Sequence, residues 1–297
     1  MNIKMKKLFV LLGVSLVVAI GFCGCGKEAE ARAKAEAKAK AEAEVEARAE
    51  AKAEAEETLR TGVVTLPGGV QLKMIKVEPG SFMMGSENGG DSDEKTVHRV
   101  TLTKPYYLGE TEVTQAQWRA VMGNNPSLFQ GDSRPVEKVS WNEAMAFCQK
   151  LNDEGKAPRG WKFTLPTEAQ WEFAARGGNK SKGYEYSGSN DIKEVAWYGG
   201  NYFGEKHHDV GTKAPNELGL YDMSGNVREW CLDGRRRYSS GAVTDPQGTQ
   251  SGSYRFVRGG SWRHGAYGCR VAYRDNYYPG GRRSDDFGFR LALVPVQ

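Results

Sequence analysis

Residues 27–60 consist almost entirely of Ala, Glu, Lys and Arg, so this stretch cannot supply a hydrophobic core. These residue types favour helix, and opposite charges recur at helical neighbour spacing, as at Glu36 and Lys40. Val45 is the only larger apolar side chain before the last turn, which leaves no seam for a coiled coil. We therefore expect a solvated helical stalk over residues 26–60, about 45–50 Å long. A frayed, partly disordered spacer is the alternative.

Residues 1–25 have the pattern of an export signal. Three lysines among the first seven residues precede an apolar run, Leu8–Phe22, that is short for a membrane span. A small residue before Cys25 resembles a lipobox, so we expect a lipoprotein signal with lipid on Cys25 rather than on Cys23. An ordinary cleaved signal or an uncleaved anchor is the alternative. All three place the remainder outside the cytoplasm, and lipidation predicts anchoring to the outer surface of the cell envelope, in the outer membrane.

The remaining composition is that of a loop-rich globular protein. The net charge of +4 is not concentrated in a basic run, so nucleic acid is not expected as a partner. Glycine (37), tyrosine (13) and tryptophan (7) are plentiful, which favours irregular structure with aromatic packing. Cys148, Cys231 and Cys269 have neither disulfide-framework nor zinc-site spacing. We expect them to be small buried side chains with at most one bridge.

Residues 61–297 predict one α+β domain with long ordered loops. Alternating residues at 70–77 and 98–102 favour strands. Helix start signals occur at Thr114, at Ser140 in a capping box, and at Thr167, whose helix should end at the glycine pair after Arg176. Regular structure is expected to become sparse beyond that point.

Several longer phrases occur in a fixed order along this domain. They are VEPGSFMMGS at 77–86, VSWNEA at 139–144, LPTEAQWEFAARGG at 165–178, PNELGLYDMSGNVREW at 215–230, VRGGSW at 257–262 and GFR at 288–290. In this order they closely resemble the formylglycine-generating-enzyme family, also called sulfatase-modifying-factor domains. The resemblance covers nearly all of residues 62–297 and implies a C-type-lectin-like fold.

The resemblance does not extend to the catalytic cysteines. Enzymes of this family oxidise a substrate cysteine with two copper-binding cysteines that follow the Arg-Gly-Gly-Ser phrase. Here only Cys269 follows it, and His264 stands near the first expected position. One thiol cannot form a two-thiolate copper site. We therefore expect no catalytic residues and no required cofactor. The alternative is an oxidoreductase that generates formylglycine or performs another metal-dependent oxidation.

The turn around Gly225 resembles a calcium-binding loop of the family. Asp222 and Glu229 would supply carboxylates, and Gly225 and Val227 backbone carbonyls. Such an ion would be structural. The alternative is that Asn226 and Glu229 form hydrogen bonds within a buried turn.

The segment between Ser261 and Phe287 alternates framework residues with runs typical of an antibody paratope. Trp262, Arg270, Arg274 and Arg290 are the expected framework. The expected ligand-binding residues are Arg263, His264, Gly265, Tyr267, Gly268, Asp275, Asn276, Tyr277, Tyr278, Arg282, Ser284, Asp285 and Asp286.

Residues 263–290 contain no Lys, Glu, Gln, Met or Trp. Codons that end in a pyrimidine cannot encode these five, and retroelements diversify proteins at the adenines of AAC and AAT codons. The chain thus resembles the variable lipoproteins of treponemes. This implies a surface-displayed, monomeric binding protein, attached to the membrane by lipid, with a protein or glycan ligand. An ordinary Tyr/Gly-rich loop region in a non-catalytic family member is the alternative for this segment, and a structural envelope protein is a further alternative for function.

Overall fold

The computed structural model describes residues 25–87, 90–200, 206–248, 252, 254–281 and 284–296. The expected export signal and Arg282 lie outside these ranges, as does the side chain of Cys25. Helix α2 runs from Cys25 to Thr61 and covers the expected stalk. Within the described ranges, no helix has the length and apolar character needed to cross a membrane.

The chain divides into two units between Glu50 and Ala51, so the globular unit includes the end of α2. The reason is local packing: Thr58 is buried, and the Tyr107 hydroxyl donates to the Leu59 carbonyl at 2.7 Å. Composition predicts that the globular unit begins at residue 61, but in the structure it begins about ten residues earlier, at Ala51.

The globular unit contains three sheets. The five-stranded sheet has the order β1-β2-β5-β12-β6, and all its pairs are antiparallel. Its strands are β1 (Val63–Thr65), β2 (Gln71–Val77), β5 (Tyr106–Gly109), β12 (Ala292–Pro295) and β6 (Trp161–Thr164). The last strand of the chain therefore lies inside this sheet, between β5 and β6.

The second sheet carries the C-terminal region and has the order β10-β9-β7-β11. Its strands are β10 (Asp275–Tyr277), β9 (Arg255–Arg258), β7 (Arg228–Gly234) and β11 (Phe287–Gly288). The third sheet consists of β3 (Gly80–Met84), β4 (His98–Leu102) and β8 (Val243–Thr244).

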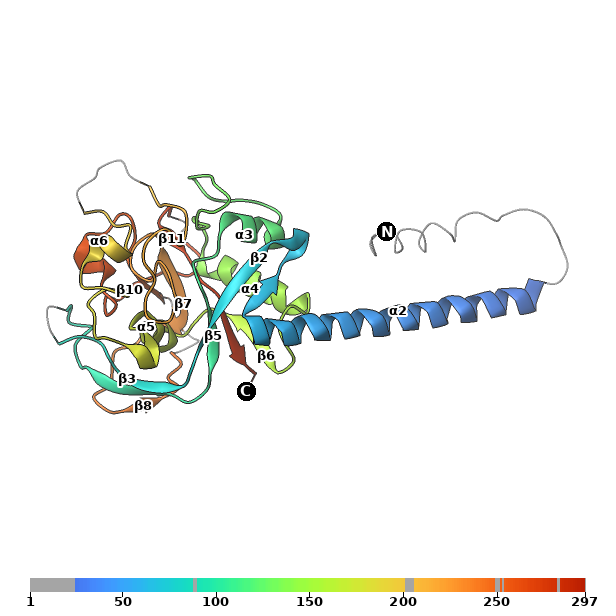
Figure 1. The fold of residues 1–297 in the computed structure, drawn as a ribbon, viewed down its shortest axis with the longest axis horizontal. Helices are drawn as coiled ribbons and strands as arrows, with labels where there is room; N and C mark the ends of the chain where they lie inside the picture. The colour runs from blue at the N-terminus through green and yellow to red at the C-terminus, as the bar shows by residue number, and fades with distance from the viewer. Residues whose placement is uncertain are drawn as a thin grey trace. The chain divides into compact units, whose positions relative to one another are not determined.

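Three helices begin where their start signals predict. Thr114, Ser140 and Thr167 are the N-caps of α3 (Gln115–Met122), α4 (Trp141–Asp153) and α5 (Glu168–Ala175), each with a complete capping box. The remaining helical segments are α6 (Ile192–Val195) and the 3₁₀ turns η1 (Pro67–Gly69), η2 (Gly178–Lys180) and η3 (Ala266–Cys269). In Figure 1, α3 and α4 lie near β2, whereas α5 and α6 lie with β7 and β10.

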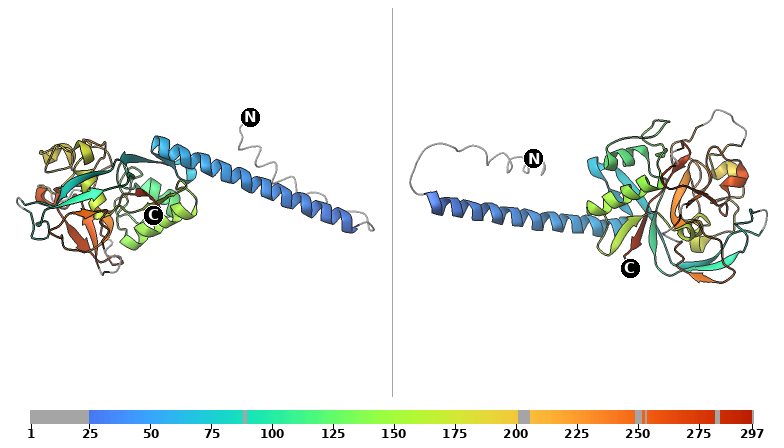
Figure 2. Two further views of the ribbon diagram at one scale, coloured as in Figure 1. Left: turned by 90° about the horizontal axis from the view of Figure 1, so that it is seen from below. Right: turned by 180° about the vertical axis from the view of Figure 1, so that it is seen from behind.

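Aromatic side chains join these elements into a core. Trp118 of α3 stacks on Phe147 of α4 at 5.5 Å, and Phe289, just after β11, packs edge-on against both. The expected α+β fold and its two expected strands are confirmed, and Figure 2 shows the arrangement from two further sides. Cys148, Cys231 and Cys269 are buried free thiols.

A polar C-terminal face on a buried arginine framework

Buried arginine–glutamate pairs underlie the C-terminal region. Arg290 donates to both carboxylate oxygens of Glu229 at 2.6 Å, and both side chains are fully buried. Arg274 holds Glu168 in the same way at 2.7 and 2.8 Å. Such two-point pairs fix the relative orientation of the groups they join. Although burial opposes ionisation, the Glu229 carboxylate raises the pKa of Arg290, so this guanidinium stays charged.

Further arginines extend this framework to the main chain. Arg258 pairs with Glu172 and also donates to the carbonyls of Val271 and Ala272, at 3.1 and 3.0 Å. Arg270 donates to both oxygens of Glu94 at 2.9 and 2.8 Å. These arginines thereby hold the backbone of residues 270–274. Arg270, Arg274 and Arg290 are buried, as expected of framework residues, whereas Trp262, the fourth expected framework residue, is only partly buried.

The turn after β9 is ordered by its own hydrogen bonds. The Ser261 hydroxyl lies 2.8 Å from Nδ1 of His264, and the amide of Arg263 donates to the same hydroxyl at 3.2 Å. A Cβ on Gly260, which has φ +69°, would lie 2.4 Å from the carbonyl oxygen of Gly268. Only glycine therefore allows the two ends of this turn to come so close.

Arg228 of β7 is the charged centre of this region. It donates to Asp286 at 2.5 Å and to the Tyr277 hydroxyl at 2.7 Å, and that hydroxyl donates to Asp275 at 2.7 Å. Burial acts to raise the pKa of Asp286, but Arg228, Ser284 and His264 together lower it. Burial and Arg228 together lower the pKa of His264, which favours its neutral form.

Among the expected ligand-binding residues that the structure describes, two tyrosines and one arginine have large exposed side chains. Tyr267 is 45% exposed and Tyr278 58% exposed, and the side chain of Arg263 is 49% exposed. Arg263 also lies 4.5 Å above the Trp262 ring, which presents its charge on an aromatic support. These side chains offer contact area without a change in the backbone.

The other expected residues differ in exposure. Those exposed or partly exposed are Gly265, His264, Asp275, Asn276, Tyr277 and Ser284. Gly268, Asp285 and Asp286 are buried. Asp285 accepts from Arg263 at 2.6 Å and Asp286 from Arg228, so each aspartate orients an arginine rather than offering a contact of its own.

Sequence reasoning missed two neighbours of this region. Tyr254 is 44% exposed and packs edge-on against Tyr278 at 5.7 Å, because Tyr277 pairs with Arg255 across β10 and β9. Leu128 is 56% exposed, and the next residue, Phe129, packs against Trp262 at 5.8 Å. No motif marks either residue, since both are placed by long-range pairing.

The turn expected to bind calcium is buried. Oδ2 of Asp222 accepts from the amide of Gly211 at 2.7 Å, whereas Oδ1 has no hydrogen-bond partner among the described residues. Glu229 is committed to Arg290 and to the Trp171 indole. No cluster of three His, Cys, Asp or Glu side chains suited to a metal occurs in the described ranges. Calcium here would thus depend on Asp222 and backbone carbonyls.

The alternative reading of this turn has direct support. The Asn226 amide donates to Glu112 at 3.3 Å and accepts from the amide of His208 at 2.9 Å. Desolvation raises the pKa of Asp222 to about 6, with Glu229 adding to the rise. Burial, followed by Asp222 and Glu229, raises the pKa of Glu112 well above its usual value. Calcium in this turn stays a prediction.

The one cysteine after the Arg-Gly-Gly-Ser phrase is poorly suited to redox chemistry. Cys269 is fully buried, and burial raises the pKa of its thiol to about 12. A thiol attacks or binds metal as the thiolate, which is scarce at neutral pH when the pKa is this high.

Comparison with known proteins gives the family. A match to the sulfatase-modifying factor enzyme 1-like domain covers residues 67–294. The chain belongs to this family. The variable protein 1 of Treponema denticola has a similar structure, with a TM-score of 0.71 and 38% identity over 78% of this chain and 98% of that one. The expected family resemblance and C-type-lectin-like fold are confirmed.

Sequence relatives in the family differ in their described roles. The chaperone protein LppX of Paenibacillus barcinonensis is 34% identical over 264 residues, covering 73% of this chain and 88% of that protein. The formylglycine-generating enzyme of Streptomyces coelicolor is 34% identical over 198 residues, covering 61% of this chain and 59% of the enzyme. The relatives of this chain therefore include both an enzyme and a protein named as a chaperone.

Proposed function

We propose that this chain is a binding protein of the cell envelope that presents the exposed side chains between Arg263 and Gly281 to a protein or glycan ligand. The contrast between exposed Tyr and Arg side chains and the buried Arg–Glu pairs beneath them carries the proposal. Ordering a loop on binding costs free energy, so a fixed backbone favours recognition by side chains alone. Tyrosine and arginine are also enriched among residues that dominate binding energy.

Diversification by a retroelement is the finer part of this proposal. Its support is the restricted residue set of 263–290 together with 38% identity to a treponemal variable protein. Deep sequencing of this gene from one population should find codon changes concentrated at adenines between Arg263 and Asp286. A downstream copy of the Arg-Gly-Gly-Ser-Trp region beside a reverse transcriptase gene should also be found. If the gene sequence does not vary in the population and no such copy is found, the diversification proposal is contradicted and the segment is an ordinary loop region.

We further propose display as a monomer on the outer surface, attached to the outer membrane by lipid on Cys25. The lipobox-like sequence and the relative LppX support an envelope location. The modest net charge supports a ligand other than nucleic acid.

Binding is tested with a triple variant, Arg263→Ala/Tyr267→Ala/Tyr278→Ala. Wild-type protein and variant are applied to one printed array of glycans and purified surface proteins. We expect wild-type signals to fall at least about tenfold in the variant, a loss of roughly 1.4 kcal/mol. The matched control, Val45→Ala/Met83→Ala/Lys180→Ala, changes three exposed side chains elsewhere and should keep every signal. Equal signals for all three proteins would contradict the proposed face.

An oxidoreductase of the formylglycine-generating type is the second candidate, supported by 34% identity to such an enzyme. When the protein is incubated with copper and a cysteine-containing peptide, we expect the mass of the peptide to stay unchanged. The reason is that Cys269 is buried and no second cysteine follows Ser261. Aldehyde formation that Cys269→Ser abolishes would establish the enzyme instead.

A further inference from the structure

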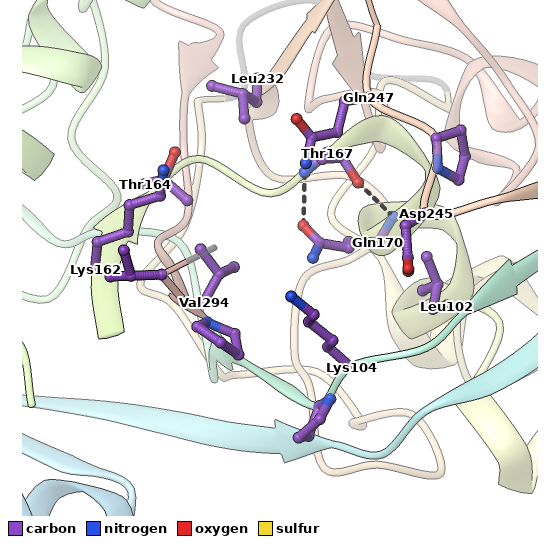
Figure 3. A pocket seen from close by; sticks show the side chains of 14 residues that line it. Leu102, Lys104, Lys162, Thr164, Thr167, Gln170, Leu232, Asp245, Gln247 and Val294 are labelled. Atoms are coloured by element: carbon purple, nitrogen blue, oxygen red, sulfur yellow. Dashed lines mark hydrogen bonds between the residues drawn. The ribbon is translucent and has the colours of Figure 1, made fainter. Parts of the chain in front are cut away.

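A separate pocket of about 370 Å³ lies beside strands β6 and β12 of the five-stranded sheet. Its lining comes from distant parts of the chain, including β6, β12, the start of α5 and the segment after β8. None of the residues between Arg263 and Asp286 lines it. Figure 3 shows the lining side chains. Its volume is at the low end of the range for small-molecule sites, roughly 300–1,000 Å³.

Part of the lining of this pocket is apolar. Leu102, Leu232 and Val294 line it together with the prolines Pro105 and Pro295. Leu102 is buried, whereas Val294 and Leu232 are only partly buried and so leave apolar surface open to an occupant. A flat or apolar portion of a small molecule would be sheltered from water here.

Two lysines and a glutamine supply hydrogen-bond donors to this pocket. Lys104 and Lys162 are exposed at its rim, and neither has an ion-pair or hydrogen-bond partner among the described residues. The Gln170 amide nitrogen likewise has no described acceptor, because its oxygen alone takes part in the capping box. The lining carboxylate, Asp245, already accepts from the amide and hydroxyl of Thr103.

The start of α5 does not itself supply the anion site. The Thr167 hydroxyl accepts from the amide of Gln170 at 3.1 Å, and Asp233 accepts from the amide of Glu168 at 2.5 Å. These are the amides that would otherwise face an anion at a helix start. The lysines must therefore provide the attraction. Two lysines and one aspartate give the lining a net charge of +1, which a singly charged carboxylate balances and a doubly charged phosphate exceeds.

We propose that this pocket binds a small carboxylate with a sugar-sized or apolar body, whose acidic group lies between Lys104 and Lys162. The ring or chain of the ligand lies against Leu232 and Val294, and Gln170 donates to one of its oxygens. The carboxylate can come from a free acid or from an acidic sugar at the end of a glycan. This site is independent of the ligand-binding face proposed above.

The test uses the full chain and nuclear magnetic resonance saturation transfer with D-glucuronate and phenylacetate. The uncharged counterparts are glucose and phenylacetamide, and a glucuronate-terminated oligosaccharide represents the glycan source. We expect at least one acid to bind about tenfold more tightly than its uncharged counterpart. The oligosaccharide should bind as well if the source is a glycan, and only the free acids should bind if it is not.

Charge-removing variants locate the site. Lys104→Gln/Lys162→Gln should weaken acid binding at least about tenfold. Lys180→Gln, an exposed lysine outside the pocket lining, should leave binding unchanged. Melting curves verify that all variants fold. Binding that survives in the double variant, or failure of every acid to bind wild-type protein, would overturn the proposal. The triple variant of the proposed binding face changes no residue of this pocket, so the outcome of the array experiment does not affect this test.

Discussion

Arg290 is a full charge in the protein interior, and it is tolerated because Glu229 meets it at two points. Replacing Arg290 with Ala would leave the carboxylate buried and unpaired. We expect the free energy of unfolding to fall by about 3–5 kcal/mol. Tyr278→Ala, at an exposed position, should change it by about 0.5 kcal/mol or less. Urea unfolding of both variants makes the comparison. A similar loss in the two would place Tyr278 in the core and refute the division into framework and contact residues.

Asp222 gives a second prediction at this scale, through pH. Its pKa is about 6 in the folded protein against a usual 3.8, so the folded state binds more protons between these values. The stability contribution of this carboxyl therefore decreases as pH rises through this window. Asp222→Asn removes this penalty, so we expect roughly 1–3 kcal/mol greater stability at pH 7 and a flatter profile from pH 4 to 6.5.

Calcium binding at this turn would reverse the effect expected of Asp222→Asn on stability. If the ion binds beside Asp222, adding calcium to chelator-treated wild-type protein should raise its melting temperature. The Asn variant would then show a smaller rise and lower stability than wild type in calcium. That result would replace the hydrogen-bonded turn with a metal site.

For helices and strands, the sequence predicts features that depend on neighbouring residues but not those that depend on pairing between distant segments. The capping residues Ser140 and Thr167 act within one turn, so sequence predicts where α4 and α5 begin. β11 pairs in parallel with β7, from which it is far apart in sequence, and no local pattern marks that partner. Likewise, composition assigns Asp285 to the surface, whereas the fold buries it and brings Arg263 within hydrogen-bond distance.

The end of α2 belongs to the globular unit, and this predicts a difference between two fragments. Residues 51–297 keep Thr58 and the Leu59 carbonyl, which accepts from Tyr107. Residues 62–297 lack both, leaving the Tyr107 hydroxyl without this acceptor at a cost of roughly 1–3 kcal/mol. We expect both fragments to unfold cooperatively, with a lower melting temperature for the shorter. Identical melting temperatures would show that the last turns of α2 contribute nothing to the stability of the globular unit.

For the whole molecule, the decisive prediction concerns attachment. Cys25→Ser should move the protein from the detergent phase to the aqueous phase after phase separation, because the lipid would be lost. Cys23→Ser is the matched control and should partition like wild-type protein. If only Cys23→Ser changes the partitioning, the lipid is on Cys23. Unchanged partitioning in both would end the lipoprotein assignment.

The position of β12 means that folding of the five-stranded sheet requires translation through to the end of the domain. This strand follows the proposed variable residues and pairs with both β5 and β6. A stop codon or frameshift introduced between Arg263 and Asp286 would remove an interior strand rather than an edge. The truncated chain would leave β5 and β6 with unpaired backbone groups. A chain truncated in this segment would therefore be unable to complete the five-stranded sheet.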